Sequence, residues 1–481
     1  MFQRLLSQKF SRNNPFCLFG AKGVGKTTMM KEFAGKFSNW IHLDLDTEVD
    51  RAIFNFEVSA EETLKAISFL KGKEIMGKGT LIVLDELYKC PDAIRWVIRF
   101  AGEHQNAPGN AGKSGHGEGV NWPLIVATSS VMTKEMATLI TPETGFMQAH
   151  HLFPFSFEEF IPSMNDPAAL EAFLEVPVPY YAYDKLLSYF HLYALIGGMP
   201  EITVKYAENR HISGLKHIYE AIEERHISCL QDVTAGKKSR NLAAEVLQNT
   251  YPYAATRISF NRFGNMEKGS REIGNAFNAL ERTFFLRMVL PVTGATLPIL
   301  PDQAKSPQLH LLDTGLVNYF SGIQKPLFQS HDMNSIFKGQ IARQVVGQEI
   351  LADANLNYSN LQYIPSGNAG IGGGISFQPP ALNFWIRDKA QSTAEVDFII
   401  PYDELLIPVV VKSGEPGRLR SLHQFIDLAP HAFAVRLYAG RLGIQQSQTI
   451  RGKKFYLLNL PYFLAGKIRD HLKGFIRLAN G

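Results

Sequence analysis

The chain has 481 residues, 45% of them hydrophobic, and this length suggests roughly two to four domains with cores of their own. Its 49 lysines and arginines nearly balance 45 acidic residues, so no global field requires nucleic acid or an anionic membrane as partner. Three cysteines lack metal-ligand spacing and favour a reducing compartment. Because there is no signal-peptide core and no long apolar stretch, we expect a soluble, cytoplasmic protein without membrane contact.

The first motif is a glycine-rich loop between a predicted strand at 15–19 and a predicted helix start at 27–33. It fits the phosphate-loop pattern G-x-x-x-x-G-K-[ST], whose backbone N–H groups turn inward around a triphosphate. The residues predicted to bind ATP are Gly20, Ala21, Lys22, Gly23, Val24, Gly25, Lys26, Thr27 and Thr28. We expect Lys26 to neutralise the terminal phosphate oxygens and the Thr27 hydroxyl to ligate Mg²⁺.

A second motif follows about sixty residues later, where the apolar run 80–84 ends in Asp85 and Glu86. This is the pattern of a Walker B strand. Asp85 is predicted to hold Mg²⁺ through its water shell, and Glu86 to orient the attacking water or take its proton. Adjacent acids at a strand end can also form a simple turn, but the upstream phosphate loop favours catalysis.

The surrounding sequence has the rhythm of a parallel sheet covered by helices on both faces. The predicted strands lie at 15–19, 40–45, 80–85, 123–128 and 149–153. A capping box at Ser59 to Glu62 and Pro91 mark two helix starts. The glycine-rich stretches at 102–121 and 367–374 are predicted to be loops, since neither has the strand and spacing of a phosphate site.

An ordered series of motifs resembles the prokaryotic AAA-type ATPases that carry a C-terminal domain of unknown function. The series comprises the phosphate loop, Leu84-Asp85-Glu86, Ala127-Thr128-Ser129-Ser130, residues 151–160, residues 195–201, residues 311–316 and residues 394–398. The resemblance implies an α/β fold in four parts. These are a P-loop AAA-type ATPase domain (1–155), a helical lid (156–225), a winged helix (226–310) and a module similar to PD-(D/E)xK nucleases (311–481).

The resemblance also assigns a role to the tip of the fourth strand, where a polar residue senses the γ-phosphate and positions the water. Thr128 and Ser129 are the candidates, although hydroxyls at strand ends are often only helix caps. Members often carry an arginine shortly before the segment at 151–160, whereas this chain has Gly145-Phe146. Lys134 cannot copy a guanidinium fork, so we expect slow hydrolysis without a trans-acting arginine from this segment.

In the nuclease-like module, Asp397 and Lys412 match the expected acid and lysine. Val410 occupies the position of the second carboxylate. Unless Glu395 or Glu349 substitutes for it, the remaining magnesium site is weak, and we expect a degenerate fold that serves binding or packing.

The predicted winged helix contains two amphipathic helices, at 240–247 and 270–280, and a strand at 283–290. Basic residues gather beside it at Lys237, Lys238, Arg240 and Arg271. They indicate either a DNA contact or a solvated or interdomain helix face.

The leading hypothesis is therefore an AAA-type ATPase that uses ATP and Mg²⁺ and whose nucleotide state arranges its C-terminal half. The alternatives are a DNA-associated or interaction module in which ATP is mainly a structural ligand, and an ATP-gated DNA nuclease. Candidate partners are DNA, through the winged helix, and further copies of the chain.

Overall fold

The structure is a computed structural model that describes residues 4–480, apart from 56, 76–78, 106–121, 141–145, 330–338, 358–381, 390–391 and 413–418. Most of the predicted glycine-rich loop at 102–121, and the whole of the one at 367–374, therefore lie outside the described residues. Gly145 also lies outside them.

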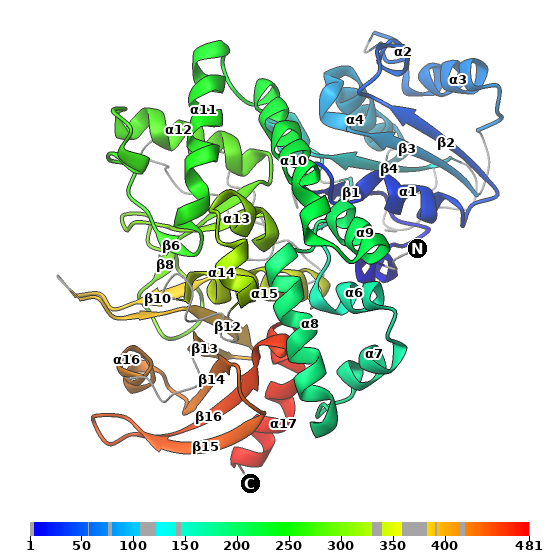
Figure 1. The fold of residues 1–481 in the computed structure, drawn as a ribbon. Helices are drawn as coiled ribbons and strands as arrows, with labels where there is room; N and C mark the ends of the chain where they lie inside the picture. Colours follow the sequence, from blue (N-terminus) through cyan, green and yellow to red (C-terminus); the bar gives the residue numbers. More distant parts are fainter. Residues whose placement is uncertain are drawn as a thin grey trace.

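The N-terminal part is a five-stranded parallel sheet in the order β2-β3-β4-β1-β5 (Figure 1). Its strands are β1 Phe16–Phe19, β2 Asn39–Asp44, β3 Thr80–Asp85, β4 Leu124–Ser129 and β5 Gln148–His151. The helices around it are α1 Lys26–Ala34, α2 Glu48–Arg51, α3 Ala60–Lys71, α4 Pro91–Gln105 and α5 Lys134–Thr138. All five predicted strands are confirmed to within two residues, and the helix starts at Ser59 and Pro91 are confirmed as well.

This sheet is buried on both faces, which explains its apolar sequence. Side chains alternate along β1: Phe16 and Leu18 join the core beneath α1, whereas Cys17 and Phe19 join the core on the α3–α4 side. All three cysteines are buried and free. The carboxyl ends of β1, β3 and β4 therefore meet at one edge, where the predicted motifs lie.

A helical region follows the sheet and lies beside it in Figure 1. Its helices are α6 Phe157–Phe160, α7 Pro167–Leu174, α8 Tyr183–Ile196, α9 Pro200–Asn209 and α10 Lys216–Cys229. Ser156 and Glu159 form a reciprocal capping box at the start of α6. The chain then enters α11 Lys237–Thr250 and α12 Ser270–Arg282, which pack on each other.

A small antiparallel sheet of order β6-β9-β7 accompanies α11 and α12. Its strands are β6 Thr256–Arg257, β7 Leu286–Val289 and β9 Gln308–Leu311. Both predicted helices are present and are longer than predicted. The predicted strand at 283–290 is shorter, because Phe284 adopts a left-handed backbone conformation (φ 59°) that precedes the extended run. The identification of this region as a winged helix stays a prediction.

The C-terminal part contains a mixed five-stranded sheet of order β12-β13-β14-β16-β15 and a smaller sheet of order β11-β10-β8. The strands are β8 Pro291–Val292, β10 Phe384–Ile386, β11 Glu395–Val396, β12 Phe398–Tyr402, β13 Leu405–Val411, β14 Phe433–Tyr438, β15 Gly443–Gln448 and β16 Lys454–Pro461. The helices of this half are α13 Thr314–Phe320, α14 Gln324–Gln329, α15 Gln340–Asn357, α16 Arg420–Leu428 and α17 Ile468–Asn480.

Helix α15 lies near the centre of the molecule (Figure 1). Its polar side chains bond several other parts of the chain. Gln344 bonds both backbone groups of Leu311, while Asn355 donates to the His151 carbonyl of β5 (2.6 Å). Glu349 accepts from the Phe157 N–H (3.0 Å) and the Tyr193 hydroxyl (2.7 Å). Buried hydrogen bonds of this kind fix how the parts pack, since each lost partner leaves a desolvated polar group.

Within the described ranges, no helix combines the length and the apolar character that a bilayer crossing requires.

Candidate functional site

The glycine-rich loop connects the end of β1 to the start of α1, as the pattern requires. Gly23 (φ 84°) and Gly25 (φ 97°) have backbone conformations that residues other than glycine rarely adopt. A Cβ atom at Gly20 would collide with the Leu152 carbonyl group, so the loop also needs glycine where it passes β5. The loop therefore opens onto the N-terminus of α1, where backbone N–H groups are free of helical partners.

Lys26 is the first residue of α1 and is only 5% exposed. Its Nζ donates to the carbonyl groups of Gly20 (2.9 Å) and Ala21 (3.2 Å) and lies 3.5 Å from the Glu86 carboxylate. The lysine thus joins the glycine-rich loop to the end of β3, and its predicted role at the phosphates stays a prediction. Lys22 is more exposed and pairs with Asp46 (2.9 Å).

The predicted magnesium ligands lie side by side. The Thr27 hydroxyl donates to Asp85 Oδ2 over 2.8 Å, and His42 Nε2 lies 3.2 Å from the same oxygen. Burial would raise the pKa of Asp85, but hydrogen bonds from His42, Thr128 and Thr27 outweigh it and lower the pKa to about 2. The carboxylate is therefore ionised at neutral pH, and with the threonine hydroxyl it forms the hard oxygen pair that Mg²⁺ prefers.

Glu86 is held in a left-handed backbone conformation (φ 55°) that is costly for a residue with a side chain. Its N–H donates to the Thr128 hydroxyl (3.0 Å), and its carboxylate accepts from the Ser130 N–H (2.9 Å) and the Ser130 hydroxyl (2.5 Å). Strain of this kind persists only when neighbouring contacts fix the residue, so the carboxylate is well positioned beside Lys26.

The structure corrects the prediction for the tip of the fourth strand. Thr128 faces the site and donates to Asp85, while its predicted role at the γ-phosphate stays a prediction. Ser129 does not, because its hydroxyl donates to the Val131 carbonyl (2.6 Å). Side chains alternate along β4, so Ser130 shares the face of Thr128, and its hydroxyl also accepts from Lys26 (2.6 Å).

The helical region approaches the loop from the other side. A Cβ atom at Gly23 would lie 3.4 Å from Met199 Cε and 4.0 Å from Nη2 of Arg225 on α10. Past the end of α10, Asp232 pairs with Lys89 (2.8 Å), which follows β3. The phosphate loop therefore lies between the parallel sheet and helices α9 and α10.

Three residues of this site had no role predicted from the sequence: His42, Ser130 and Arg225. Period-2 alternation along β4 could have favoured Ser130 over Ser129. His42 lies on the strand adjacent to β3, which a predicted strand order would have indicated. Arg225 had no sequence signal, since its place depends on how α10 packs.

The predicted C-terminal residues also come together. Asp397 Oδ2 accepts from the Val411 N–H (2.8 Å) and lies 3.8 Å from Lys412 Nζ, and Arg343 lies 3.9 Å from the same carboxylate. Val410 is buried in an apolar cluster. Burial, aided by the charge of Asp397, raises the pKa of Glu395, whereas Glu349 is committed to Phe157 and Tyr193. Glu349 therefore cannot replace the missing carboxylate.

The basic residues near α11 and α12 are on the surface. Lys238 is 89% exposed, Lys237 and Arg271 are exposed, and Arg240 is half-buried. Lys238 lies 3.7 Å from Glu272, so part of its charge is offset. This geometry is compatible both with a DNA contact and with a solvated or interdomain helix face.

Comparisons with known proteins agree with the N-terminal geometry. Residues 12–161 match a family model described as an AAA domain, and residues 187–327 match that of a domain of unknown function, DUF8612. No curated protein matches.

Two similar solved structures come from Aeropyrum pernix. The ORC1 protein in complex with DNA has 12% identity and a TM-score of 0.28, over 67% of this chain and 90% of that chain. The ORC2 protein, with ADPNP and ADP, has 12% identity and a TM-score of 0.24, over 66% of this chain and 91% of that chain. The family match and the five-stranded parallel sheet together support a nucleotide-binding AAA-type P-loop ATPase domain within residues 12–161.

Proposed function

We propose that this protein is a magnesium-dependent ATPase whose nucleotide state controls its C-terminal half. One observation carries the proposal: Lys26, Thr27, Asp85 and Glu86 meet in one buried cluster. In this cluster the Walker B carboxylates already contact the two phosphate-loop side chains that act on a nucleotide. The division of the chain at 155, 225 and 310 remains part of the proposal.

Each residue of the cluster has a role that follows from its contacts. The loop N–H groups and Lys26 bind the phosphates, and Thr27 and Asp85 would hold Mg²⁺. The bound ion would neutralise charge that develops on the phosphate oxygens. Glu86 takes the proton of the attacking water, and Ser130 holds its carboxylate in place. Thr128 fixes the backbone of Glu86.

Arg225 supplies a cation from this chain itself. Its guanidinium lies beside Gly23 and pairs with Glu201 on α9, so a movement of α10 that carried it toward the bound phosphates would add positive charge there. A cis arginine of this kind would offset the absence of an arginine between Ser129 and His151. Hydrolysis would then depend on where the helical region sits over the loop.

A direct connection links the site to α12. Two residues beyond Ser130, the Met132 N–H donates to the Arg282 carbonyl, and the Arg282 guanidinium donates to the Met132 carbonyl, each over 2.9 Å. If Ser130 moves when nucleotide binds, these hydrogen bonds would transmit the displacement to the C-terminal end of α12. If the region around α12 is a winged helix, this route would make any DNA contact depend on ATP.

The second candidate function is a DNA-associated or interaction module in which ATP acts mainly as a structural ligand. The exposed cations Lys237, Lys238 and Arg271 are available for a DNA contact, and the absence of an arginine between Ser129 and His151 favours slow turnover. The two functions differ in measurable rate rather than in the architecture of the site.

We do not propose an ATP-gated nuclease. Asp397 and Lys412 lie 3.8 Å apart, as an acid and lysine of such a site would, but the position of a second acid is a buried valine, and Arg343 lies 3.9 Å from the Asp397 carboxylate, where it would oppose a metal ion. Supercoiled plasmid should therefore stay intact with Mg²⁺ or Mn²⁺, with or without ATP. Metal-dependent cleavage by the unmodified chain that disappears in Asp397→Ala, in a preparation whose Lys26→Ala variant still folds, would restore the nuclease hypothesis.

The test of the proposed function uses two variants of the whole chain, sized by light scattering. Lys26→Ala should lose binding of a fluorescent ATP analogue, because the loop loses its main phosphate-facing charge. Glu86→Gln should bind ATP but not turn it over, because an amide cannot accept the proton. Steady-state turnover is measured with and without duplex and single-stranded DNA. Normal turnover by Glu86→Gln would place the catalytic base elsewhere, and tight binding without measurable turnover by the unmodified chain would favour the second candidate.

A further inference from the structure

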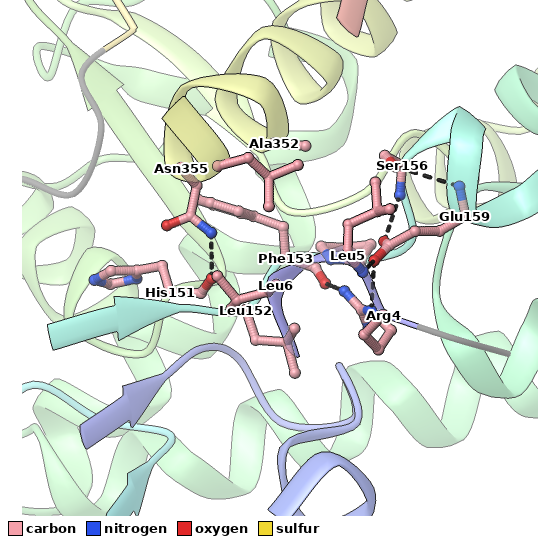
Figure 2. Close-up of a pocket in the computed structure, with 12 residues that line it drawn as sticks. Arg4, Leu5, Leu6, His151, Leu152, Phe153, Ser156, Glu159, Ala352 and Asn355 are labelled. Atoms are coloured by element: carbon pink, nitrogen blue, oxygen red, sulfur yellow. Dashed lines mark hydrogen bonds and ion pairs between the residues drawn. The ribbon is translucent and has the colours of Figure 1, made fainter. Parts of the chain in front are cut away.

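Arg4 lies near the start of the described chain, yet its side chain reaches the phosphate loop and is only 8% exposed. Figure 2 shows it in a pocket between the residues after β5 and helix α15. Its Nη1 donates to the Val24 carbonyl (2.9 Å), its Nη2 to the Phe153 carbonyl (2.6 Å) and its Nε to the Glu159 carboxylate (3.1 Å). Each nitrogen of the guanidinium therefore has an acceptor.

The contact with Val24 bears on the loop because Val24 lies between two glycines. A trans peptide unit is planar, and its C=O and N–H groups point in opposite directions. Arg4 holds the Val24 carbonyl on the side of the pocket, so the Gly25 N–H of the same peptide unit is turned to the opposite side of the loop. A flip of this peptide unit changes ψ of Val24 and φ of Gly25. Gly25 already has φ 97° and tolerates a wide range of φ values, so an external hydrogen bond to the Val24 carbonyl helps to fix the orientation.

Arg4 is itself firmly held. The Glu159 carboxylate that accepts from Arg4 also accepts from the Leu5 N–H (2.7 Å) and the Ser156 N–H (3.1 Å). The guanidinium also lies over the Phe155 ring at 4.7 Å from its centre. These contacts anchor the arginine to the capping box of α6, so the orientation of the loop peptide is fixed by the helical region.

We propose that Arg4 is a positioning residue of the phosphate loop, which it serves by turning the Gly25 N–H toward the phosphates of a bound nucleoside triphosphate. The inference rests on the proposed function, since it concerns the same site. Arg4 contacts the loop on the side opposite the Gly25 N–H and acts through the Val24–Gly25 peptide unit. Its loss therefore affects binding more than the chemical step, because its contacts do not include Glu86 or Ser130.

The test compares Arg4→Lys with Asn355→Ala. A lysine ammonium cannot reach three diverging acceptors at once, so it keeps the charge but not the fork. Asn355 lines the same pocket, and its side chain donates to the His151 carbonyl rather than to the Val24 carbonyl that Arg4 bonds (Figure 2). The readouts are the Kd of a fluorescent ATP analogue, the KM and kcat for ATP, and the thermal midpoint of each variant without nucleotide.

We expect Arg4→Lys to raise Kd and KM about tenfold, the size of one lost hydrogen bond to a charged group, while kcat stays within about threefold. Asn355→Ala should lower the thermal midpoint similarly but leave Kd within about twofold. If Arg4→Lys does not fold, Glu159→Gln serves instead. It keeps an acceptor but loses the charge that holds Arg4, and a severalfold rise in Kd is expected.

The outcomes distinguish a failure of the proposed function from a failure of the inference about Arg4. If the unmodified chain does not bind ATP, the proposed function fails whatever Arg4 does. If the unmodified chain binds ATP, the inference about Arg4 is overturned when the Kd of Arg4→Lys is within about twofold of the Kd of the unmodified chain. The same criterion applies to Glu159→Gln where that variant replaces an unfolded Arg4→Lys. An equal rise in Kd for Asn355→Ala would also overturn it, since the effect would then follow from pocket stability alone.

Discussion

At the residue scale, two adjacent serines at the end of β4 have different surroundings. The Ser130 hydroxyl donates to Glu86 and accepts from Lys26, whereas the Ser129 hydroxyl meets only backbone groups of Val131. Ser130 therefore connects Glu86, the proposed general base, to Lys26, the proposed phosphate-binding lysine, and Ser129 bonds the turn that follows the strand.

We predict that Ser130→Ala lowers kcat about tenfold or more, because a hydrogen bond to a charged group contributes roughly 1.5–3 kcal/mol. Ser129→Ala should change kcat by less than about threefold. Steady-state ATP turnover of the two purified variants, matched for thermal midpoint, measures the difference. A larger loss in Ser129→Ala would show that the strand tip acts through the opposite face.

At the scale of elements, the strands of the first sheet could be predicted because buried parallel strands are apolar runs. The motifs at their ends followed from the pattern G-x-x-x-x-G-K-[ST] and from paired acids. Contacts between distant segments could not be predicted in this way. The position of Arg225 beside Gly23 and the bond from Arg4 to Val24 depend on tertiary packing, which no local period records.

The motifs at residues 195–201 and 311–316, which are far apart in the sequence, pack against each other in the structure. Asp313 caps α13 and also accepts from the Gly198 N–H (2.7 Å), and a Cβ atom at Gly197 would collide with the Asp313 carboxylate. A Cβ atom at Gly315 would collide with the Ile196 carbonyl group. Both motifs therefore need their glycines for close approach, and their contacts join the end of α8 to the start of α13.

The link between β4 and α12 gives a prediction at the same scale. In a Glu86→Gln background that retains ATP, nucleotide should change hydrogen exchange of the amides in α12, because Met132 is bonded to Arg282 in both directions. Arg282→Ala removes the side-chain half of this link and should reduce the nucleotide-dependent change by about half or more.

Arg271→Ala is the matched control for that experiment, since Arg271 is an exposed arginine on the same helix. Its nucleotide-dependent exchange should equal that of the background protein. If Arg282→Ala retains the full change while binding ATP normally, nucleotide reaches α12 by another route or not at all.

At the scale of the whole molecule, α15 ties the parallel sheet, the helical region and the C-terminal half together through buried polar groups. One of them is ionisable. Burial raises the pKa of Glu349 to about 8, although hydrogen bonds from Tyr193 and the Phe157 N–H act in the opposite direction. The junction between the parts is therefore sensitive to pH.

The sign of this effect follows from proton linkage. The pKa of Glu349 in the folded chain is above the ordinary value of 4.5, so the folded chain binds more protons than the unfolded chain between about pH 4.5 and 8. The contribution of Glu349 to stability is complete below pH 4.5 and is lost as pH rises to about 8. The slope in this window is at most about 1.4 kcal/mol per pH unit for one proton.

Glu349→Gln tests this, because an amide oxygen can still accept from Tyr193 and Phe157 but carries no charge at any pH. The variant should match the unmodified chain near pH 5 and unfold at a higher denaturant concentration at pH 8 to 9. Urea unfolding of both proteins across this range measures the difference, and the comparison cancels other groups such as Asp313, whose pKa burial also raises, to about 6. Parallel curves for the two proteins would mean that Glu349 is ionised in the folded chain, and that the contacts from Tyr193 and Phe157 compensate fully for its burial.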